Sequence, residues 1–151
     1  MIEDIYNFRR VDENLSTSGQ PTEAQLAAAA GAGFEVVINL ALHDDPRYSL
    51  ADEAGTVKSL NMEYVHIPVR FDAPAEADLM QFIAAMKQHA GKKILVHCAA
   101  NMRVSAFLGL YRMIDQGWDR DQAFALMATL WEPNPVWSVF IANMLEKHPE
   151  A

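Results

Sequence analysis

The chain has 151 residues, of which 51% are hydrophobic and 21% charged, and its formal net charge is −8. This composition is typical of one globular domain spanning residues 1–151, and it excludes a disordered or fibrous protein. The acidic excess argues against a protein that binds nucleic acid over an extended surface, and the single cysteine excludes an internal disulfide, a zinc site of several thiolates and an iron–sulfur cluster.

Strands and helices are predicted to alternate along the chain. Hydrophobic periodicity, β-branched runs and turn residues indicate, in chain order, a strand at 14–19, a helix at 22–30 that Thr22 caps, a strand at 35–40, a helix at 49–60, a strand at 63–69, a helix at 76–89, a strand at 93–96, and helices at 104–114, 120–131 and 137–147. This alternation predicts an α/β fold, with a mostly parallel central sheet covered by helices on both faces. Ligands bind such sheets beyond the carboxyl ends of the strands, so we expect the site in the loops at 41–48, 68–75 and 97–103.

The last predicted strand is followed at once by the single cysteine, Cys98, within the sequence ILVHCAANMRVSAF at 94–107. A thiol between a strand and the N-terminus of a helix faces unpaired backbone amides and the positive end of the helix dipole, and both favour the thiolate. The same amides are able to hold an oxyanion, which Arg103 would clamp through a bidentate guanidinium contact. The sequence therefore predicts a nucleophilic cysteine in an anion-binding loop.

Three residues near Cys98 have predicted supporting roles. His97 and Ser105 are placed to orient the sulfur or to hydrogen-bond it. The segment 99–102 contains no glycine, although a loop that closes around an anion usually needs a residue with positive φ. Asparagine tolerates that conformation better than most residues, so we expect Asn101 to adopt it.

These residues resemble the phosphate-binding loop of the cysteine-dependent phosphatases, in which His-Cys is followed by a loop, an arginine and a serine or threonine. Only four residues separate Cys98 from Arg103, one fewer than is usual. This shorter loop is similar to that of a bacterial protein tyrosine phosphatase-like family, which is related to the dual-specificity phosphatases and is also found fused to metallo-β-lactamase-like hydrolases. The resemblance covers about 15–114 and includes Ser-Gly-Gln-Pro at 18–21, Val-Ile-Asn-Leu at 37–40 and Tyr-Val-His-Ile-Pro-Val at 64–69.

The resemblance implies the dual-specificity phosphatase-like fold and a phosphatase that needs no metal or cofactor. Cys98 would be the nucleophile that forms a phosphocysteine, Arg103 the phosphate clamp, and Asp72 the general acid and then the base for the attacking water. The expected partner is a phosphorylated protein or a small phosphomonoester. The residues implied to hold the phosphate are Ala99, Ala100, Asn101, Met102 and Arg103.

Two other functions stay open at this point. One is a pseudophosphatase module that binds phosphate without turnover, which is favoured if Asp72 cannot reach the loop. The other is a rhodanese-like sulfurtransferase or an arsenate-type redox enzyme. The lack of a second cysteine argues against redox chemistry, and an Asp-bearing loop is not needed by a persulfide carrier. Asp78 and Asp44 compete with Asp72 for the role of the acid.

Several polar residues at the same rim are expected to be structural or solvated. His43, Asp44 and Asp45 form a pattern that occasionally holds a metal, but adjacent acids in a proline-containing loop are usually solvated, so no metal site is predicted. Arg47 and Arg70 are expected to form ordinary surface pairs rather than substrate contacts.

Three further residues are predicted to support the core. His66 lies in an apolar strand and is interpreted as a hydrogen-bonded core or rim histidine, and Trp131 and Trp137 as core anchors. The first ten residues carry no apolar leader, and no apolar run approaches the length of a membrane span, so a cytoplasmic location with no membrane partner is expected.

Overall fold

The computed structural model describes residues 1–43 and 49–149. Within these residues, five strands form one sheet in the order β1-β2-β5-β3-β4. The strands are β1 (Arg9–Arg10), β2 (Leu15–Ser18), β3 (Val36–Asn39), β4 (Glu63–His66) and β5 (Ile94–His97). All neighbours pair in parallel except β1, which lies antiparallel to β2 at the edge. The predicted α/β class and mostly parallel sheet are therefore confirmed, whereas the two-residue strand β1 is too short for a sequence pattern to indicate.

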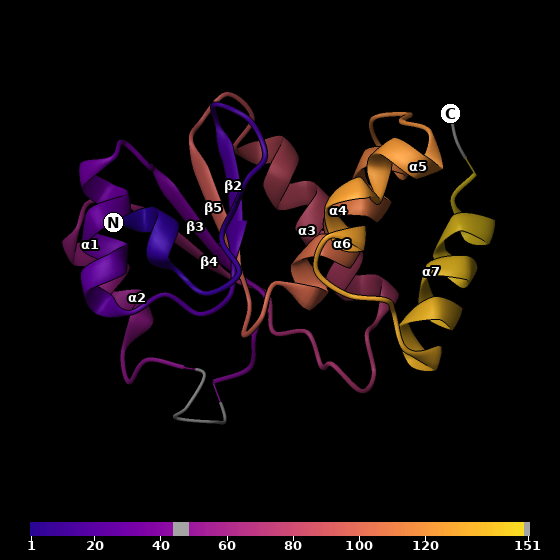
Figure 1. Ribbon diagram of the computed structural model, residues 1–151, viewed down its shortest axis with the longest axis horizontal. Helices are drawn as coiled ribbons and strands as arrows, with labels where there is room; N and C mark the ends of the chain where they lie inside the picture. Colours follow the sequence, from indigo (N-terminus) through magenta and orange to yellow (C-terminus); the bar gives the residue numbers. More distant parts are fainter. Residues whose placement is uncertain (44–48, 150–151) are drawn as a thin grey trace.

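Helices cover both faces of the sheet, as predicted. They are η1 (Ile2–Asp4), α1 (Glu23–Gly31), α2 (Glu53–Ser59), α3 (Glu76–Gln88), α4 (Met102–Ile114), α5 (Arg120–Ala123), α6 (Ala125–Ala128) and α7 (Pro135–Lys147). Figure 1 shows α1 and α2 on one side of the sheet and α3 and α4 on the other, with α5, α6 and α7 packed outside α4. No helix in these described ranges is long and apolar enough to cross a bilayer.

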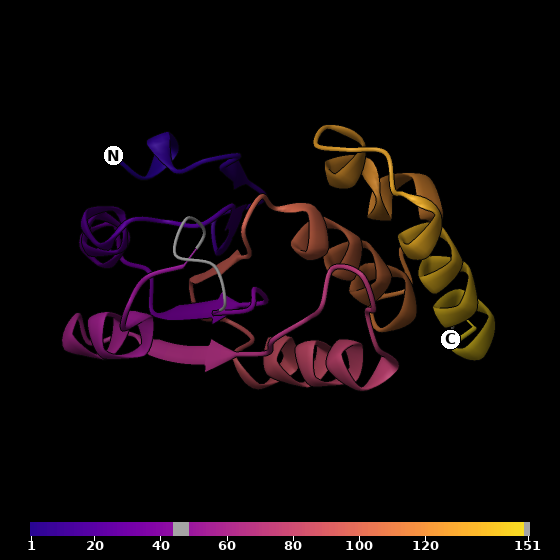
Figure 2. The same cartoon turned by 90° about the horizontal axis from the view of Figure 1, so that it is seen from below.

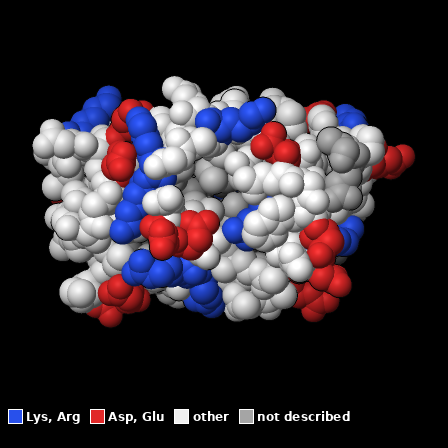
Figure 3. Space-filling view, turned by 90° about the horizontal axis from the view of Figure 1, so that it is seen from above, with Lys and Arg blue, Asp and Glu red and all other residues white. Residues whose placement is uncertain are grey.

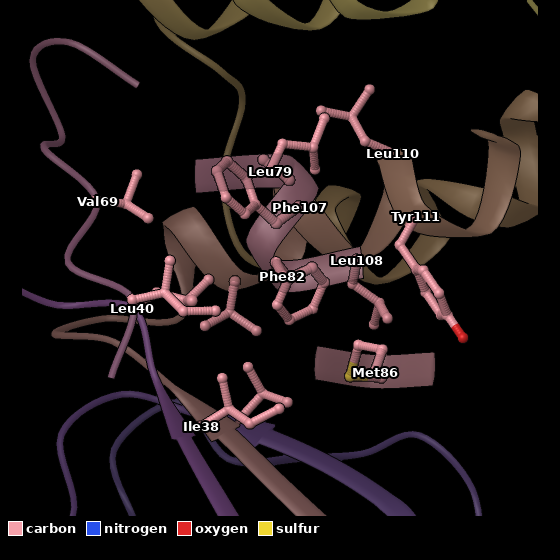
Figure 4. Close-up of a cluster of buried hydrophobic side chains, with 14 of the residues drawn as sticks. Ile38, Leu40, Val69, Leu79, Phe82, Met86, Phe107, Leu108, Leu110 and Tyr111 are labelled. Atoms are coloured by element: carbon pink, nitrogen blue, oxygen red, sulfur yellow. The ribbon is translucent and has the colours of Figure 1, made fainter. Parts of the chain in front are cut away.

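Successive strand residues supply two separate apolar clusters, because side chains alternate between the faces of a strand. Val37 packs into the smaller cluster with Leu26 of α1 and Val57 of α2. Ile38, the next residue, packs into the larger cluster with Phe107 of α4. Figure 4 shows this larger cluster, to which α3 and α4 contribute aromatic and aliphatic side chains. The sheet is thus anchored on both faces, and its strand ends are held in fixed register.

Three predicted elements have wrong boundaries, and a contact between helices accounts for the first and a local cap for the second. The helix predicted at 120–131 breaks at Phe124 (φ −102, ψ 12) into α5 and α6, and the Phe124 ring packs directly on Gly109 of α4. The helix predicted at 49–60 begins only at Glu53, because the side chain of Asp52 accepts a hydrogen bond from the Gly55 amide and caps it there. The strand predicted at 63–69 ends at His66.

The predicted cap of α1 is confirmed. The Thr22 hydroxyl accepts from the Gln25 amide (3.1 Å), and the Gln25 side chain accepts from the Thr22 amide (2.9 Å). This reciprocal pair is a capping box, which satisfies two of the donors that a helix N-terminus leaves free.

Candidate active site

Cys98 lies directly after β5, the strand whose neighbours are β2 and β3. His97 is in register with Ser18 on one side and with Asn39 on the other, so the loops that follow three parallel strands meet at this point. The Cys98 amide donates to the Ser18 carbonyl (3.3 Å), and the residue is only 1% exposed. Four residues later the chain enters α4, so the predicted strand, loop and helix around the thiol are present.

The left-handed residue of the loop is Asn101, as predicted. Its φ is 65° and its ψ is 14°. Its side-chain amide donates to the Asn7 carbonyl and to the Thr17 hydroxyl, each at 2.9 Å. These two bonds attach the loop to the segment before β1 and to β2, so an asparagine supplies both the backbone conformation and its anchor.

Two carbonyls of the loop are hydrogen-bonded to neighbouring segments, whereas most of its amides have no acceptor in the described part of the chain. The Ala99 carbonyl accepts from the Gln20 amide, and the Ala100 carbonyl accepts from the Asn7 side chain, each at 3.0 Å. Gly19 packs so closely on the Ala99 carbonyl that a Cβ would not fit. Among the described residues, no acceptor is bonded to the amides of Ala99, Ala100, Met102, Arg103 and Val104. Free amides at the N-terminus of a 13-residue helix form a site for an anion.

Arg103 stands in the first turn of α4 and is 8% exposed. Its Nη1 donates to the Val69 carbonyl (2.8 Å), and its guanidinium carbon lies 6.0 Å from the centre of the Phe71 ring. Within the described ranges it forms no ion pair with a carboxylate. A guanidinium with one acceptor keeps donors for a bidentate contact with an oxyanion.

His97 contacts the main chain of Cys98 and a buried carboxylate. Its Nδ1 lies 3.3 Å from the Cys98 carbonyl oxygen, and its Nε2 lies 2.6 Å from Oε2 of Glu53. Both side chains are fully buried. Because each ring nitrogen faces an oxygen, the imidazole is held from both sides between Glu53 and the main chain of Cys98. His97 therefore orients the backbone of Cys98, and no hydrogen bond in the described structure joins its ring to the sulfur.

Glu53 is a residue of the site that the sequence does not indicate. Burial raises its pKa, but the hydrogen bond and charge of His97, with a hydrogen bond from Gln20 (2.8 Å), outweigh that effect and hold the pKa below its ordinary value. The carboxylate is thus ionised in the core. The sequence does not indicate that a glutamate near the start of a short helix is buried, because its partner, His97, lies far away in the sequence on β5.

The Ser105 hydroxyl, predicted to lie near the sulfur, is hydrogen-bonded to other groups. Its hydroxyl donates to the Met102 carbonyl (3.0 Å) and accepts from the Trp131 indole (3.1 Å). It therefore joins the start of α4 to the segment before α7. The predicted anchors agree with this arrangement, because Trp131 is half-buried against the core and Trp137 is fully buried.

The loop that carries Asp72 is attached to the site by its backbone. The Val69 carbonyl accepts a hydrogen bond from the Arg103 guanidinium, and the Phe71 carbonyl accepts one from the Trp137 indole (2.8 Å). Figure 2 shows this loop beside the first turn of α4. The Asp72 carboxylate itself is exposed and accepts two hydrogen bonds from Arg70, each 3.0 Å long. Arg70 is therefore a surface pair, as expected, and it lowers the pKa of Asp72.

Asp78 and Asp44 compete with Asp72 for the role of the general acid. Asp78 lies in the first turn of α3, where burial raises its pKa. A raised pKa suits a proton donor better than the lowered pKa of Asp72 does. The other competing acid, Asp44, lies outside the described residues, as do Asp45 and Arg47.

The remaining histidines of this rim have hydrogen-bond partners. His66 is exposed, and its Nε2 lies 2.6 Å from the Ala41 carbonyl oxygen, which confirms a hydrogen-bonded rim histidine. His43 Nε2 lies 3.1 Å from the Tyr64 hydroxyl and 3.1 Å from the Asn39 amide. This cluster therefore supports the carboxyl ends of β3 and β4.

Comparison with known proteins identifies the family. The family model of the dual-specificity-type tyrosine phosphatase fused to NAD⁺ kinase matches residues 3–134. The chain belongs to this dual-specificity and tyrosine phosphatase-like family. A candidate phosphatase of the DUF442 group from Shewanella putrefaciens CN-32 has 34% sequence identity and a TM-score of 0.85, and the match covers 97% of this chain and 96% of that one. No functionally curated protein matches the chain.

More distant phosphatases share the fold of this family member. The active form of Tk-PTP matches with a TM-score of 0.73 at 22% identity, over 93% of this chain and 95% of that one. PTPMT1 in complex with PI(5)P matches with a TM-score of 0.76 at 17% identity, again over 93% and 95%. The dual-specificity phosphatase-like fold expected from the sequence is therefore confirmed.

Proposed function

We propose that this phosphatase-family chain hydrolyses phosphomonoesters through a phosphocysteine on Cys98. The observation that carries the proposal is the set of loop amides after Cys98 for which the described residues provide no acceptor, followed in the first turn of α4 by Arg103, whose guanidinium keeps free donors. A phosphate in this loop would accept hydrogen bonds from the amides through its equatorial oxygens, while Arg103 binds two of those oxygens. This positive field replaces a metal ion.

The reaction proceeds in two displacements. The Cys98 thiolate attacks phosphorus in line, an S–P bond forms, and the bond to the leaving oxygen breaks while Asp72 gives that oxygen a proton. Water then attacks the phosphocysteine, Asp72 takes the proton from that water, and the S–P bond breaks to release inorganic phosphate. The first step leaves Asp72 deprotonated, and the second step restores its proton and the free Cys98 thiolate.

Asp72 must leave Arg70 before it acts as an acid. While the pair is formed, Arg70 holds the pKa of Asp72 down and the carboxyl keeps no proton. Both side chains are exposed, at 65% and 71%, and ion pairs of exposed groups are weak. The Val69 and Phe71 carbonyls are held by Arg103 and Trp137, so the backbone of the loop stays in place. Rotation of the Asp72 side chain is then enough to separate its carboxylate from Arg70.

Glu53 and His97 serve as positioning residues in this proposal. The ionised Glu53 holds the His97 ring through Nε2, and the ring holds the Cys98 carbonyl through Nδ1. The pair thereby fixes the position of Cys98 without touching the substrate.

A second candidate function is phosphate binding without turnover. The observation that favours it is the pairing of Asp72 with Arg70, which leaves no proton donor on that side chain. The loop and Arg103 would then bind phosphate tightly and release it unchanged. The family assignment gives no support to sulfur transfer or to arsenate-type redox chemistry.

The substrate class in this proposal is a phosphorylated protein or a small phosphomonoester. PTPMT1, which shares the fold, was solved with PI(5)P, a ligand that carries one phosphomonoester group. Recognition in the loop requires only one accessible phosphate, so an acidic chain of net charge −8 is compatible with it.

The test is turnover of an aryl phosphate by the wild type and by matched variants. We expect Cys98→Ser and Arg103→Ala to abolish turnover, and Arg120→Ala, which removes an arginine from outside the loop, to leave it unchanged. The hydrolase proposal is wrong if the wild type binds phosphate but shows no turnover, which would support the binding module. It is also wrong if Cys98→Ser retains turnover.

A further inference from the structure

A hollow lies at the end of the sheet opposite to Cys98, where β2 and β5 begin. Its volume is about 320 Å³, near the lower limit for small-molecule pockets. Figure 3 looks onto this end of the molecule and shows the hollow near the middle of the face, with Lys and Arg side chains beside it. The residues that line it include Asp12, Leu15, His89, Lys92, Arg112 and Trp118.

Arg112 is the most unusual residue of this hollow. It lies in the last turn of α4 and is 8% exposed, and its guanidinium carbon stacks 4.1 Å above the Trp118 ring. Across residues 1–43 and 49–149 its guanidinium has neither a carboxylate partner nor a hydrogen-bond acceptor. A guanidinium so far removed from solvent normally pairs with an anion, because desolvating an unpaired charge is unfavourable.

The unpaired donors of Arg112 are accessible from the hollow. In the described part of the chain, the side-chain polar atoms that lack both solvent exposure and a hydrogen-bond partner are His89 Nδ1 and Asn101 Oδ1. The nitrogens of Arg112 also lack a partner there but are not among these atoms, so they retain some exposure to solvent. Stacking on Trp118 occupies the face of the guanidinium and leaves the N–H groups along its edge free. The edge of Arg112 is therefore available for a ligand.

The charges around Arg112 indicate which anion fits. Lys92 is paired with Glu63 (3.2 Å), so its charge is largely compensated. Asp12 attracts Arg112 without forming an ion pair with it, and the Asp12 carboxylate accepts from the Asn14 amide (2.7 Å). At most one positive charge is therefore uncompensated, which matches a singly charged carboxylate better than a phosphate dianion.

We propose that this hollow binds a small organic acid, whose carboxylate accepts two hydrogen bonds from the edge of the Arg112 guanidinium. Trp118 and the apolar wall at Leu15 contact the body of the acid. Binding there is independent of the thiol, because β5 and the length of α4 separate the hollow from the loop of Cys98.

The experiment is a titration of ¹⁵N-labelled protein with benzoate or lactate, with benzamide as the uncharged control. We expect saturable shifts of the Trp118 indole and of the Gly91 and Gln116 signals, with a dissociation constant of about 1 mM or below. The Met102 amide, in the catalytic loop, should not move. Inorganic phosphate is the second arm, and it should shift Met102 rather than Trp118.

Variants make the assignment specific. Arg112→Gln should weaken benzoate binding at least about tenfold, as the loss of a charged hydrogen bond predicts, while Lys87→Gln, which alters a charge paired with Asp115 outside the hollow, should not. Asp12→Asn keeps Arg112 intact and should strengthen binding, because it removes an opposing charge. Unchanged affinity in both Arg112→Gln and Asp12→Asn, equal binding of benzamide, or tighter binding of phosphate at Trp118 would each overturn the proposal.

Discussion

Glu53 and His97 lie 44 residues apart in the chain and meet through a 2.6 Å contact between two fully buried side chains. One comes from α2 and the other from the end of β5, so the pair joins a helix on one face of the sheet to the strand that immediately precedes Cys98. Removing one partner leaves a buried polar atom of the other, Oε2 of Glu53 or Nε2 of His97, without its partner in the core. Both the stability of the fold and the state of the thiol are therefore expected to depend on this contact.

Glu53→Gln should destabilise the protein by about 3–5 kcal/mol at neutral pH. The pKa of Glu53 is lower in the fold than its ordinary value of 4.5, so its stabilising contribution is present above that value and is lost as the pH falls through the folded pKa. The difference in unfolding free energy between wild type and variant, measured by urea titration, should shrink on acidification. Glu146→Gln, at an exposed position, is the control and should change little.

The same pair should influence the reactivity of the thiol. If Glu53→Gln is folded, alkylation of Cys98 by iodoacetamide at about pH 6 should slow, because the His97 ring loses its carboxylate partner and holds the Cys98 carbonyl less firmly in the reactive loop. Glu53→Asp retains the carboxylate and should restore part of the rate. A purely structural role would lower the yield of folded protein but leave the alkylation rate of the folded fraction unchanged.

Asp72→Asn should lower kcat by about 10²- to 10⁴-fold with an alkyl phosphate and much less with a good leaving group. Arg70→Gln removes the group that holds the pKa of Asp72 down, so more of the acid stays protonated and the basic limb of the kcat profile should move to higher pH. Asp78→Asn is the matched control. If that variant alone loses the basic limb, Asp78 is the acid and the assignment of Asp72 is wrong.

Gly109→Ala should destabilise the protein, because an added Cβ would overlap the Phe124 ring. Overpacking of this kind typically costs about 1–3 kcal/mol, and the better helix propensity of alanine offsets about 1 kcal/mol of it. Gly31→Ala, at the end of α1, has open space around the new Cβ and should be neutral or slightly stabilising. Equal melting temperatures for the two variants would contradict this account of the break between α5 and α6.

Local sequence signals were sufficient for the parts of the site that depend on neighbouring residues. The apolar runs of β3 and β5 predict buried strands, and the position of Cys98 directly after β5 follows from them. Asn101 is predictable because few residues with a side chain tolerate positive φ.

Contacts between distant segments could not be predicted from the same signals. The burial of Glu53 depends on His97, and the break in the helix predicted at 120–131 depends on Gly109 of another helix. Asp72 and Arg70 are only two residues apart in the sequence. The geometry of the loop nevertheless decides which way the exposed carboxylate turns, and no sequence pattern indicates it. The acid is consequently the least predictable member of the site.

The most direct test of the central claim is to trap the intermediate. The wild type and Asp72→Asn would be mixed with an aryl phosphate, quenched in acid during turnover, digested and analysed by mass spectrometry. We predict one phosphoryl group on the peptide that contains Cys98, and neither the label nor turnover in Cys98→Ser. Turnover without a phosphoryl group on Cys98, or with the group on another residue, would contradict the phosphocysteine mechanism.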